Sequence, residues 1–431
     1  MNRRRFIYGS AIGGMALGAF PNIILARRQK VYSVALIGTG WWGMNILNAA
    51  IASGTVKVVA LCDVDQKMMA EALDKVKTQT GDTPALFTDY REMLHKQKPE
   101  IVIIATPDHW HALPAIEALK AGCHIYLEKP ICHTIDEGKA IVAAQKKYGK
   151  VLQVGLHRHI GPHNVAGMEF IKSGKVGDIK LVRAFVNYQY NERAQRPDEQ
   201  PPDTLDWDMY CGPAQLLPYN PGIHPRGFRN YLEFTNGTCA DWGVHWMDQI
   251  LWWSEEKQPK SVHSTGGVFD PNSSADAPDW QVASFEFENF TAQWEHRRLG
   301  SNTVDKHPYG VYFHGTKGTF HMGWIDGWTF YPAAKGEQEV HMDHTLHMPD
   351  HQNIPELWAD LIGAIETGRK PVADIQNSQY ATNMSLLAMM SYKLGRSVTW
   401  DGDKQTVVND PEALKLMRRD YRGPWVYPEV V

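Results

Sequence analysis

The chain has 431 residues and a formal net charge of −4 at pH 7. This length exceeds what a single hydrophobic core usually supports, so it predicts two domains with extensions. The charges are of mixed sign without a long basic run, which argues against nucleic acid or an anionic membrane surface as a partner and favours a small polar ligand. Five cysteines lack CxxC or zinc-ligand spacing and are interpreted as small buried residues: Cys62, Cys123, Cys132, Cys211 and Cys239.

Residues 1–26 have the composition of a targeting peptide. A basic stretch, Arg3–Arg5, precedes Phe6 and an apolar, Gly/Ala-rich segment that is shorter than a membrane span. The paired arginines before Phe6 resemble a twin-arginine signal, a bacterial route that exports folded proteins. We therefore expect a removable signal and a periplasmic or otherwise exported protein with no membrane association after its removal. An amphiphilic anchor or a disordered basic tail is the alternative.

From Val31, short β-branched runs alternate with segments of helical period. This pattern predicts a Rossmann-type, doubly wound parallel sheet with crossover helices over residues 31–155. Thr134 and Glu137 form a capping box at the start of the last of these helices. The expected strands are 34–37, 56–62, 101–105, 124–127 and 151–154, and the expected helices lie near 41–53, 112–121 and 135–148.

The first strand leads into a glycine turn, Gly38–Gly43, with the pattern of a dinucleotide-binding motif. Gly38 permits the tight turn, Gly40 lets backbone amides approach a pyrophosphate, and Gly43 lets the helix pack on the strand. Asp63 follows the second strand, where a ribose-binding carboxylate is expected, although it could instead cap the next helix. An acidic group there repels a 2′-phosphate, so the sequence favours NAD over NADP.

The turns after two later strands should also border the cofactor, because ligands bind outside the carboxyl ends of the strands in a doubly wound sheet. These turns are residues 106–111, with the sequence TPDHWH, and residues 128–130, with the sequence EKP. The cofactor-binding candidates are Gly38, Gly40, Trp41, Trp42, Gly43, Asp63, Thr106, Pro107, His109, His111, Glu128 and Lys129.

Three motifs in order resemble the glucose-fructose oxidoreductase and inositol dehydrogenase family, called Gfo/Idh/MocA. They are residues 106–111 with the Ala121-Gly122 turn, the EKP element, and residues 237–248, which are similar to the family's GxxxDxGxHxxD element. The resemblance extends from about Val34 to Asp248. It implies that Lys129 lies beside the nicotinamide and the substrate, and that Asp241 and His245 complete the catalytic group.

Weaker similarities extend the comparison with this family. Residues 153–155 followed by Arg158 resemble the family's segment that enters the substrate domain, which makes Arg158 a candidate substrate contact. Residues 206–208 and 226–229 resemble a secreted branch of the family.

Oxidation of a secondary alcohol removes a hydride and a proton together, so a base must face the hydroxyl opposite the nicotinamide. Asp241 and His245 are four residues apart and share one face if this stretch is helical, with Asp241 orienting the imidazole or holding a neighbouring hydroxyl. Lys129 comes from the other domain, where its ammonium can polarise the developing carbonyl or transfer a proton. The catalytic candidates are Lys129, Asp241 and His245, and the substrate-binding candidates are these three and Arg158.

Beyond Gly155 the periodicity becomes the alternation typical of antiparallel strands. It predicts a C-terminal α+β domain over residues 156–400, built on an open, largely antiparallel sheet, and an extension over 401–431. The uncovered face of such a sheet roofs the active site or pairs with another subunit, so we expect a homo-oligomer. The expected strands are 181–190, 282–287, 291–296 and 311–313, the expected loop is 191–206, and the expected helices are 355–367 and 377–394, packed near the first domain.

Two residue types in the second half have alternative explanations. Tryptophan and tyrosine side chains stack on sugar rings but more often build cores; they are Trp207, Tyr210, Trp242, Trp246, Trp324 and Trp328. Four histidines are unevenly spaced and lack a carboxylate in a fixed pattern, so we expect no metal site and favour a polar loop over the cleft; they are His341, His344, His347 and His351.

Together these features predict an exported NAD-dependent oxidoreductase that acts on a ring hydroxyl of a sugar or glycoside. A 3-keto sugar is one candidate for its product. Because free NAD is scarce outside the cytoplasm, the cofactor is expected to stay tightly bound and to be recycled. One alternative is an NAD-dependent glycosidase, which oxidises transiently, eliminates the glycosidic substituent and re-reduces. The other is a non-catalytic sugar or NAD sensor with the same fold.

Overall fold

The computed structural model describes residues 30–187, 196–269, 273–298, 300, 306–348 and 351–429. The expected signal, residues 1–26, lies outside these ranges, as do residues 188–190 of an expected strand and residues 191–195 of the expected loop. Val31–Val431 form one unit that contains both sheets of the protein. In the described ranges, none of the helices combines the length and the apolar character that a membrane crossing requires.

The first sheet has six parallel strands in the order β3-β2-β1-β4-β5-β6. This arrangement confirms the predicted doubly wound sheet, and the strand order reverses between β1 and β4, where such sheets bind ligands. The strands are β1 Tyr32–Ile37, β2 Val56–Cys62, β3 Ala85–Phe87, β4 Ile101–Ile104, β5 His124–Leu127 and β6 Leu152–Val154. The helices are α1 Trp41–Ala52, α2 Gln66–Thr80, α3 Tyr90–Gln97, α4 Ala112–Lys120 and α5 Ile135–Tyr148, and α5 begins with the predicted capping box.

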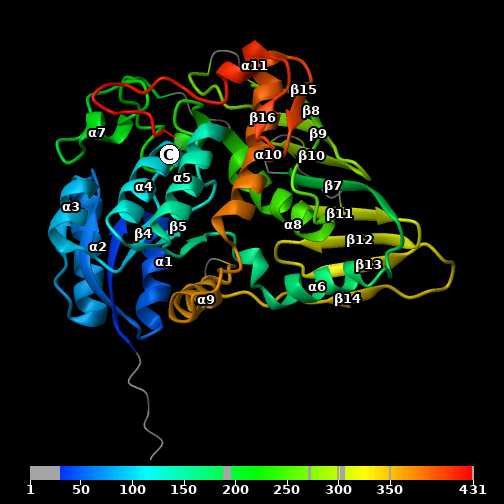
Figure 1. The fold of residues 1–431 in the computed structure, drawn as a ribbon, viewed down its shortest axis with the longest axis horizontal. Coiled ribbons are helices and arrows are strands. Elements are labelled where there is room, and N and C mark those ends of the chain that lie inside the picture. Colours follow the sequence, from blue (N-terminus) through cyan, green and yellow to red (C-terminus); the bar gives the residue numbers. More distant parts are fainter. Residues whose placement is uncertain are drawn as a thin grey trace, which may run out of the picture. The chain divides into compact units, whose positions relative to one another are not determined.

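Both faces of this sheet are buried, because successive residues of a strand enter different cores. Val34 and Leu36 belong to a core that also contains side chains of α1, whereas Ala35 and Ile37 belong to the core on the side of α4 and α5. The first core includes Trp358 of helix α9, Ile354–Thr367, which lies against α1 (Figure 1). A helix from the second half of the chain therefore completes the cover of the first sheet.

The second sheet has ten strands in the order β14-β13-β12-β11-β7-β10-β9-β8-β15-β16. Only the β7–β10 pairing is parallel among those described, which confirms a largely antiparallel sheet. The strands are β7 Ile179–Asn187, β8 Ser261–Gly267, β9 Trp280–Glu286, β10 Thr291–Arg297, β11 Tyr309–Gly315, β12 Gly318–Gly323, β13 Trp328–Pro332, β14 Val340–Met342, β15 Val398–Asp401 and β16 Thr406–Val407.

Helices cover one face of the second sheet (Figure 1). They are α6 Pro162–Lys172, α8 Val244–Ser254 and α10 Ile375–Leu394. The opposite face carries Arg183, Glu295 and Tyr312 together with the partly exposed side chains of Leu181 and Val282. Pairing of this face with a second subunit remains a prediction.

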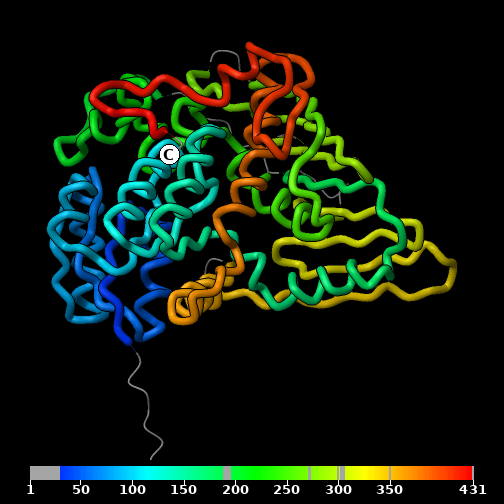
Figure 2. Tube along the Cα trace, in the orientation of Figure 1, coloured from blue at the N-terminus to red at the C-terminus, as the bar shows by residue number. Residues whose placement is uncertain are grey.

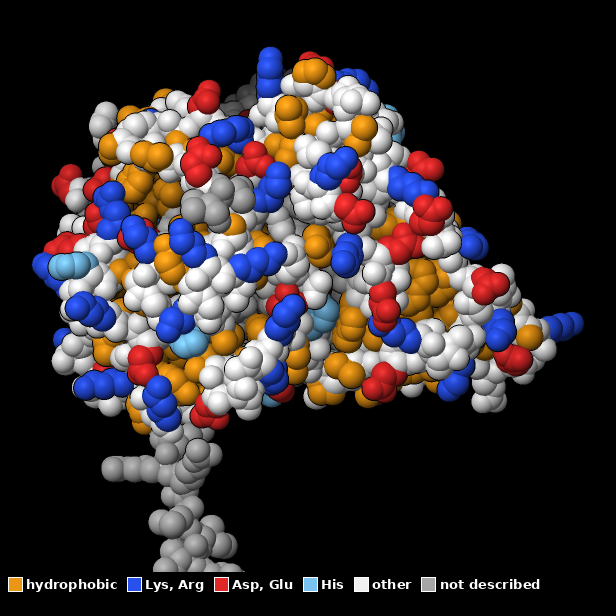
Figure 3. Space-filling view, viewed as in Figure 1, with side chains coloured by type: hydrophobic (Ala, Val, Ile, Leu, Met, Phe, Trp, Pro, Cys, Tyr) orange, Lys and Arg blue, Asp and Glu red, His pale blue; other side chains and the backbone are white. Residues whose placement is uncertain are grey.

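Two irregular segments of the second half lie on the first domain. One contains the short helix α7, Trp207–Cys211, and reaches the end of β2. The other follows helix α11, Pro411–Lys415, and passes over α4 and α5 towards the C-terminus (Figure 2). On the face drawn in Figure 3, basic and acidic side chains are interspersed, in keeping with the mixed charge of the sequence.

Candidate active site

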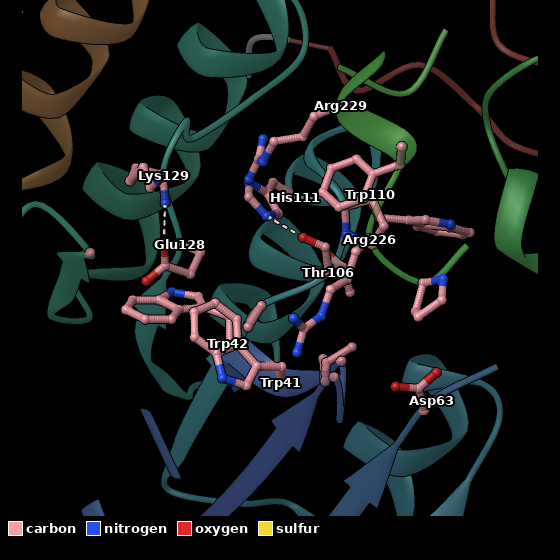
Figure 4. Close-up of a pocket in the computed structure, with 18 of the residues that line it drawn as sticks. Trp41, Trp42, Asp63, Thr106, Trp110, His111, Glu128, Lys129, Arg226 and Arg229 are labelled. Atoms are coloured by element: carbon pink, nitrogen blue, oxygen red, sulfur yellow. Dashed lines mark hydrogen bonds between the residues drawn. The ribbon is translucent and has the colours of Figure 1, made fainter. Parts of the chain in front are cut away.

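Segments from both domains line one cavity of about 440 Å³. The glycine turn after β1 and the ends of β4 and β5 contribute its walls (Figure 4). The helical turn around Asp241 also lines it. Residues that are more than a hundred positions apart in the sequence therefore meet in a single site.

The glycine turn has the backbone geometry that a dinucleotide phosphate requires. Gly38 has a φ of +91°, and a Cβ there would lie 2.6 Å from the carbonyl oxygen of Ala105. A Cβ on Gly43 would lie 2.0 Å from the carbonyl oxygen of Gly38, so the close packing of α1 on the strand depends on this glycine. No side chain caps α1, which begins after Gly40, so its first amides are available to an anion.

Asp63 lies at the end of β2 and lines the cavity (Figure 4). Its carboxylate accepts hydrogen bonds from the backbone N–H of Thr39 at 2.6 Å and from the Thr39 hydroxyl at 2.8 Å. Burial raises the pKa of Asp63, and these hydrogen bonds oppose the rise. The alternative in which Asp63 caps the next helix is wrong, because the N-cap of α2 is Asp65, whose side chain accepts from Lys67 and Met68.

Polar atoms on the cavity wall support a dinucleotide ligand. The Thr106 hydroxyl and both ring nitrogens of His157 are buried and have no hydrogen-bond partner in the described part of the chain. The His111 ring nitrogens lie 2.6 Å from the Pro130 carbonyl oxygen and 2.9 Å from that of Thr106, so His111 joins the turns after β4 and β5. The glycine turn, Asp63 and these unpaired groups fit an NAD-type cofactor.

Lys129 and Asp241 form an ion pair at the boundary between the two domains. The Lys129 Nζ donates to Asp241 Oδ1 at 2.8 Å and to the Asp241 carbonyl oxygen at 3.1 Å. Arg229 lies on the other side, with Nε 3.2 Å from Asp241 Oδ1 and Nη1 3.0 Å from Asp108 Oδ1. Although burial raises the pKa of Asp241, the charges of Arg229 and Lys129 bring that pKa below its usual value. Asp241 is therefore held as a carboxylate between two cations.

His245 lines the same cavity and is 3% exposed. Burial, together with the charge of Lys129, moves the pKa of His245 well below its usual value, so the ring is neutral at pH 7. Its ring lies edge-on to Trp324 at 5.0 Å. The stretch is helical, as expected, but Cys239–Gly243 form a wider π-helical turn before α8. Asp241 bonds to Lys129 and Arg229, and within the described residues it makes no hydrogen bond to His245, so the expected orientation of the imidazole by Asp241 is not seen.

The structure places three predicted site residues outside the cavity lining. Gly43 has the packing role given above. His109 is buried, its Nε2 contacts the Tyr210 carbonyl oxygen at 2.9 Å, and burial lowers the pKa of His109 to about 3, so we reassign it from cofactor binding to packing. Arg158 is fully buried behind the cavity wall, 3.6 Å from the Trp324 ring centroid, and it donates to the Trp324 carbonyl oxygen. It supports Trp324 and does not reach a substrate directly.

The remaining cofactor candidates line the cavity: Gly38, Gly40, Trp41, Trp42, Asp63, Thr106, Pro107, His111, Glu128 and Lys129. The sequence motifs assign no site role to Arg229 or to three other lining residues, His157, His224 and Arg226. His157 is adjacent to the chosen Arg158, and the RGFR segment was noted only for its similarity to a family branch. Their positions depend on folding of distant segments, which leaves no spacing signal in the sequence.

The four histidines of residues 341–351 show no shared ligand geometry. His341 contacts Thr329, and His347 contacts Glu356. Among the described residues a different group, His307, His321 and Asp326, has side-chain ligand atoms within 4.8 Å of one another. The two imidazoles of this group are stacked with centroids 3.7 Å apart, and none of the three residues lines the cavity.

Comparison with known proteins identifies the family. Residues 32–156 match the model of the NAD-binding Rossmann-fold domain of the Gfo/Idh/MocA oxidoreductases, and residues 185–427 match the model of their C-terminal alpha/beta domain. The chain belongs to the Gfo/Idh/MocA oxidoreductase family. This places it among NAD(P)-dependent oxidoreductases and confirms the resemblance of the three motifs.

Curated relatives of this Gfo/Idh/MocA protein include a glycosyl hydrolase family 109 protein of Shewanella baltica, 28% identical over 160 residues, and an alpha-N-acetylgalactosaminidase of Shewanella oneidensis, 27% identical over 160 residues. Each match covers 36% of this chain and 35% of the relative's length. The similarity therefore spans about a third of each curated relative.

Solved structures share the fold at low sequence identity. The aldose-aldose oxidoreductase of Caulobacter crescentus, complexed with glycerol, has a TM-score of 0.65 and 17% identity over 86% of this chain and 100% of that one. The WlbA dehydrogenase of Bordetella pertussis, complexed with NADH and UDP-GlcNAcA, has a TM-score of 0.63 and 20% identity over 86% of this chain and 99% of that one. These similarities show a common fold.

Proposed function

We propose that this Gfo/Idh/MocA protein oxidises a ring hydroxyl of a sugar or glycoside with NAD that stays bound between turnovers. The product is a keto sugar, and a 3-keto sugar is one candidate. The observation that carries the proposal is the 2.8 Å contact between Lys129 Nζ and Asp241 Oδ1, in a cavity that also contains His245, Asp63 and the glycine turn. We also propose that Arg3–Arg5 belong to an export signal, which would make retention of the cofactor necessary.

The site residues can perform the proton chemistry of an alcohol oxidation. Bound in this cavity against the glycine turn and Asp63, NAD supplies the hydride acceptor. The imidazole of His245 is uncharged and lines the cavity, so a ring nitrogen can accept the hydroxyl proton. The ammonium of Lys129, held by the carboxylate of Asp241, stabilises negative charge on the reacting oxygen.

An oxidative glycosidase is the second candidate, and the similarity to the Shewanella alpha-N-acetylgalactosaminidase favours it. Oxidation of one ring carbon acidifies the adjacent C–H bond, so the glycosidic substituent can leave by elimination before water adds and the ketone is reduced again. The same three side chains serve both reactions. The two candidates differ in their products, since only the glycosidase releases a free reducing sugar without net reduction of the cofactor.

The test begins with the purified protein, which is denatured so that any released dinucleotide can be identified. The intact protein is then incubated with a panel of sugars and glycosides. A keto sugar supports the dehydrogenase, and a free reducing sugar without accumulation of NADH supports the glycosidase. Absence of both products with every substrate tested would contradict an enzymatic role and leave a sugar or NAD sensor.

The variant Lys129→Met assigns the reaction to the cavity. We expect it to retain the dinucleotide but to lower kcat by about a hundredfold or more, because the reacting oxygen loses its cationic partner. Lys139→Met is the matched control, since Lys139 pairs with Asp136 within α5 and does not line the cavity. Unchanged turnover of Lys129→Met would remove Lys129 from the mechanism.

A further inference from the structure

A segment of the second half, residues 196–231, is held against the nucleotide-binding domain at the end of β2. We call this segment the arm. The backbone N–H of Asp206 donates to the Val64 carbonyl oxygen at 3.0 Å, and the N–H of Gln66 donates to the Thr204 carbonyl oxygen at 2.9 Å. These backbone bonds lie next to Asp63, so the arm is fixed at the rim of the dinucleotide cavity.

A side-chain contact fixes the part of the arm that enters the cavity. The Nε2 of His224 lies 2.9 Å from Oδ2 of Asp65, and both side chains are largely buried. A tight turn follows, in which a Cβ on Gly227 would lie 1.6 Å from the carbonyl oxygen of Gly222. His224 and Arg226 both line the cavity, so this turn presents Arg226 to the site.

Arg226 lies over the start of α1. Its guanidinium carbon is 5.1 Å from the centroid of the Trp41 ring, and Trp41 is the residue that follows Gly40 in the glycine turn (Figure 4). No carboxylate in the described ranges lies within ion-pair distance of Arg226. In contrast, Arg229 of the same arm is paired with both Asp108 and Asp241. The cavity therefore contains a cation without an anion, beside a turn whose geometry suits phosphate.

We propose that Arg226 binds a phosphate of the dinucleotide and that the arm thereby holds the cofactor against the glycine turn. This inference rests on the proposed function, since it requires a dinucleotide in this cavity. The phosphate has two sources: the pyrophosphate common to NAD and NADP, and the 2′-phosphate of NADP alone. The position of the guanidinium over Trp41, at the N-terminus of α1, favours the pyrophosphate, and the carboxylate of Asp63 disfavours a 2′-phosphate.

The experiment measures the binding of NADH and NADPH to the purified, cofactor-depleted protein by the fluorescence of the reduced nicotinamide. Arg226→Gln should weaken both ligands equally, by about ten- to a hundredfold, because a charge-assisted contact to phosphate is lost. Arg226→Lys should recover part of the affinity. The matched control is Arg196→Gln, which removes an exposed arginine of the same arm that does not line the cavity.

Each other result contradicts a defined part of the argument. Weakening of NADPH alone would overturn the pyrophosphate assignment in favour of the 2′-phosphate. If Arg226→Gln bound NADH and NADPH as tightly as the wild type does, the role of the arm would be overturned and the proposed function would remain intact. Failure of the wild-type protein to bind either ligand would overturn both. Thermal melting of each variant separates a loss of contact from a loss of folding.

Discussion

At the scale of single residues, the charges around Asp241 separate the roles of the side chains in the proposed reaction. Two cations, Lys129 and Arg229, contact one carboxylate, so Asp241 is poorly suited to accept a proton. His245 lines the same cavity as an uncharged imidazole, which has a nitrogen lone pair available to a proton. The contact of Asp241 with Lys129 thus orients an ammonium, whereas the sequence had pointed to an orienting role towards the imidazole.

Glu128 gives a prediction about pH at this scale. Burial raises the pKa of Glu128 from 4.5 to about 7. The pKa of Glu128 is higher in the folded protein than in the unfolded chain. Its contribution to the free energy of unfolding is therefore fully present below pH 4.5, and it is lost as the pH rises through 7. The loss amounts to at most about 3 kcal/mol in the free energy of unfolding.

Glu128→Gln should remove this part of the pH dependence. Urea denaturation of the cofactor-free protein at about pH 5 and about pH 8 measures it, with the variant gaining stability over wild type only at the higher pH. Glu117→Gln, which removes an exposed carboxyl of α4, should leave the wild-type profile unchanged. A constant difference between wild type and Glu128→Gln across this range would show that Glu128 is ionised throughout.

At the scale of elements, the sequence predicted the strands whose pattern of apolar residues matches their burial in the structure. The strands of the first sheet are short, apolar and buried on both faces, and four of the five expected strands differ from the observed bounds by at most one residue. Strand β8 was missed because, of its seven residues, only Val262 is a large apolar side chain. The three-residue strand β3 was also missed.

The sequence predicted the residues of the candidate site only where they belong to a motif. Lys129, Asp241 and His245 belong to motifs, and the structure brings them to one cavity. Arg226 and His157 reach the cavity through the packing of distant segments, which no local spacing records. His109 and Arg158 were chosen for their places in motifs, but burial directs their side chains into packing contacts.

The strand-turn-helix element after β1 yields a paired prediction. Gly43→Ala should lower the thermal midpoint of the cofactor-free protein, at a cost of about 1–3 kcal/mol, because the new Cβ meets backbone that cannot move away easily. Gly40→Ala should leave that midpoint nearly unchanged, since its Cβ meets only the end of the Met68 side chain at 3.5 Å. It should instead weaken NADH binding by blocking the approach of a phosphate to the backbone.

Melting curves and NADH titrations of both alanine variants check this contrast. If Gly40→Ala bound NADH as wild type does, the turn would not be a phosphate site. If Gly43→Ala melted as wild type does, the close contact of α1 with the strand would not limit stability.

At the scale of the whole molecule, the C-terminal segment joins the arm to the first domain. Arg422 pairs with Asp208 of α7 at 2.6 Å and donates to the carbonyl oxygens of Gly212 and Ala214. Tyr421, one residue earlier, donates its hydroxyl hydrogen bond to Glu137 of α5 at 2.8 Å. The segment therefore holds the arm and the helices of the nucleotide-binding domain at the same time.

Release of this segment should weaken cofactor binding, although none of residues 418–429, the described part of the segment, lines the cavity. Removal of residues 418–431 frees the arm from α5, so Arg226 is less well positioned, and we expect the release of NADH to become faster by about tenfold or more. Arg422→Gln, which breaks only the contacts with the arm, should show a smaller change in the same direction while the fold is retained. Tyr427→Phe is the control, because it removes one hydroxyl contact with Thr134 and leaves the arm in place. If the truncated protein released NADH at the wild-type rate and only its thermal midpoint were lowered, the segment would have a role in stability alone.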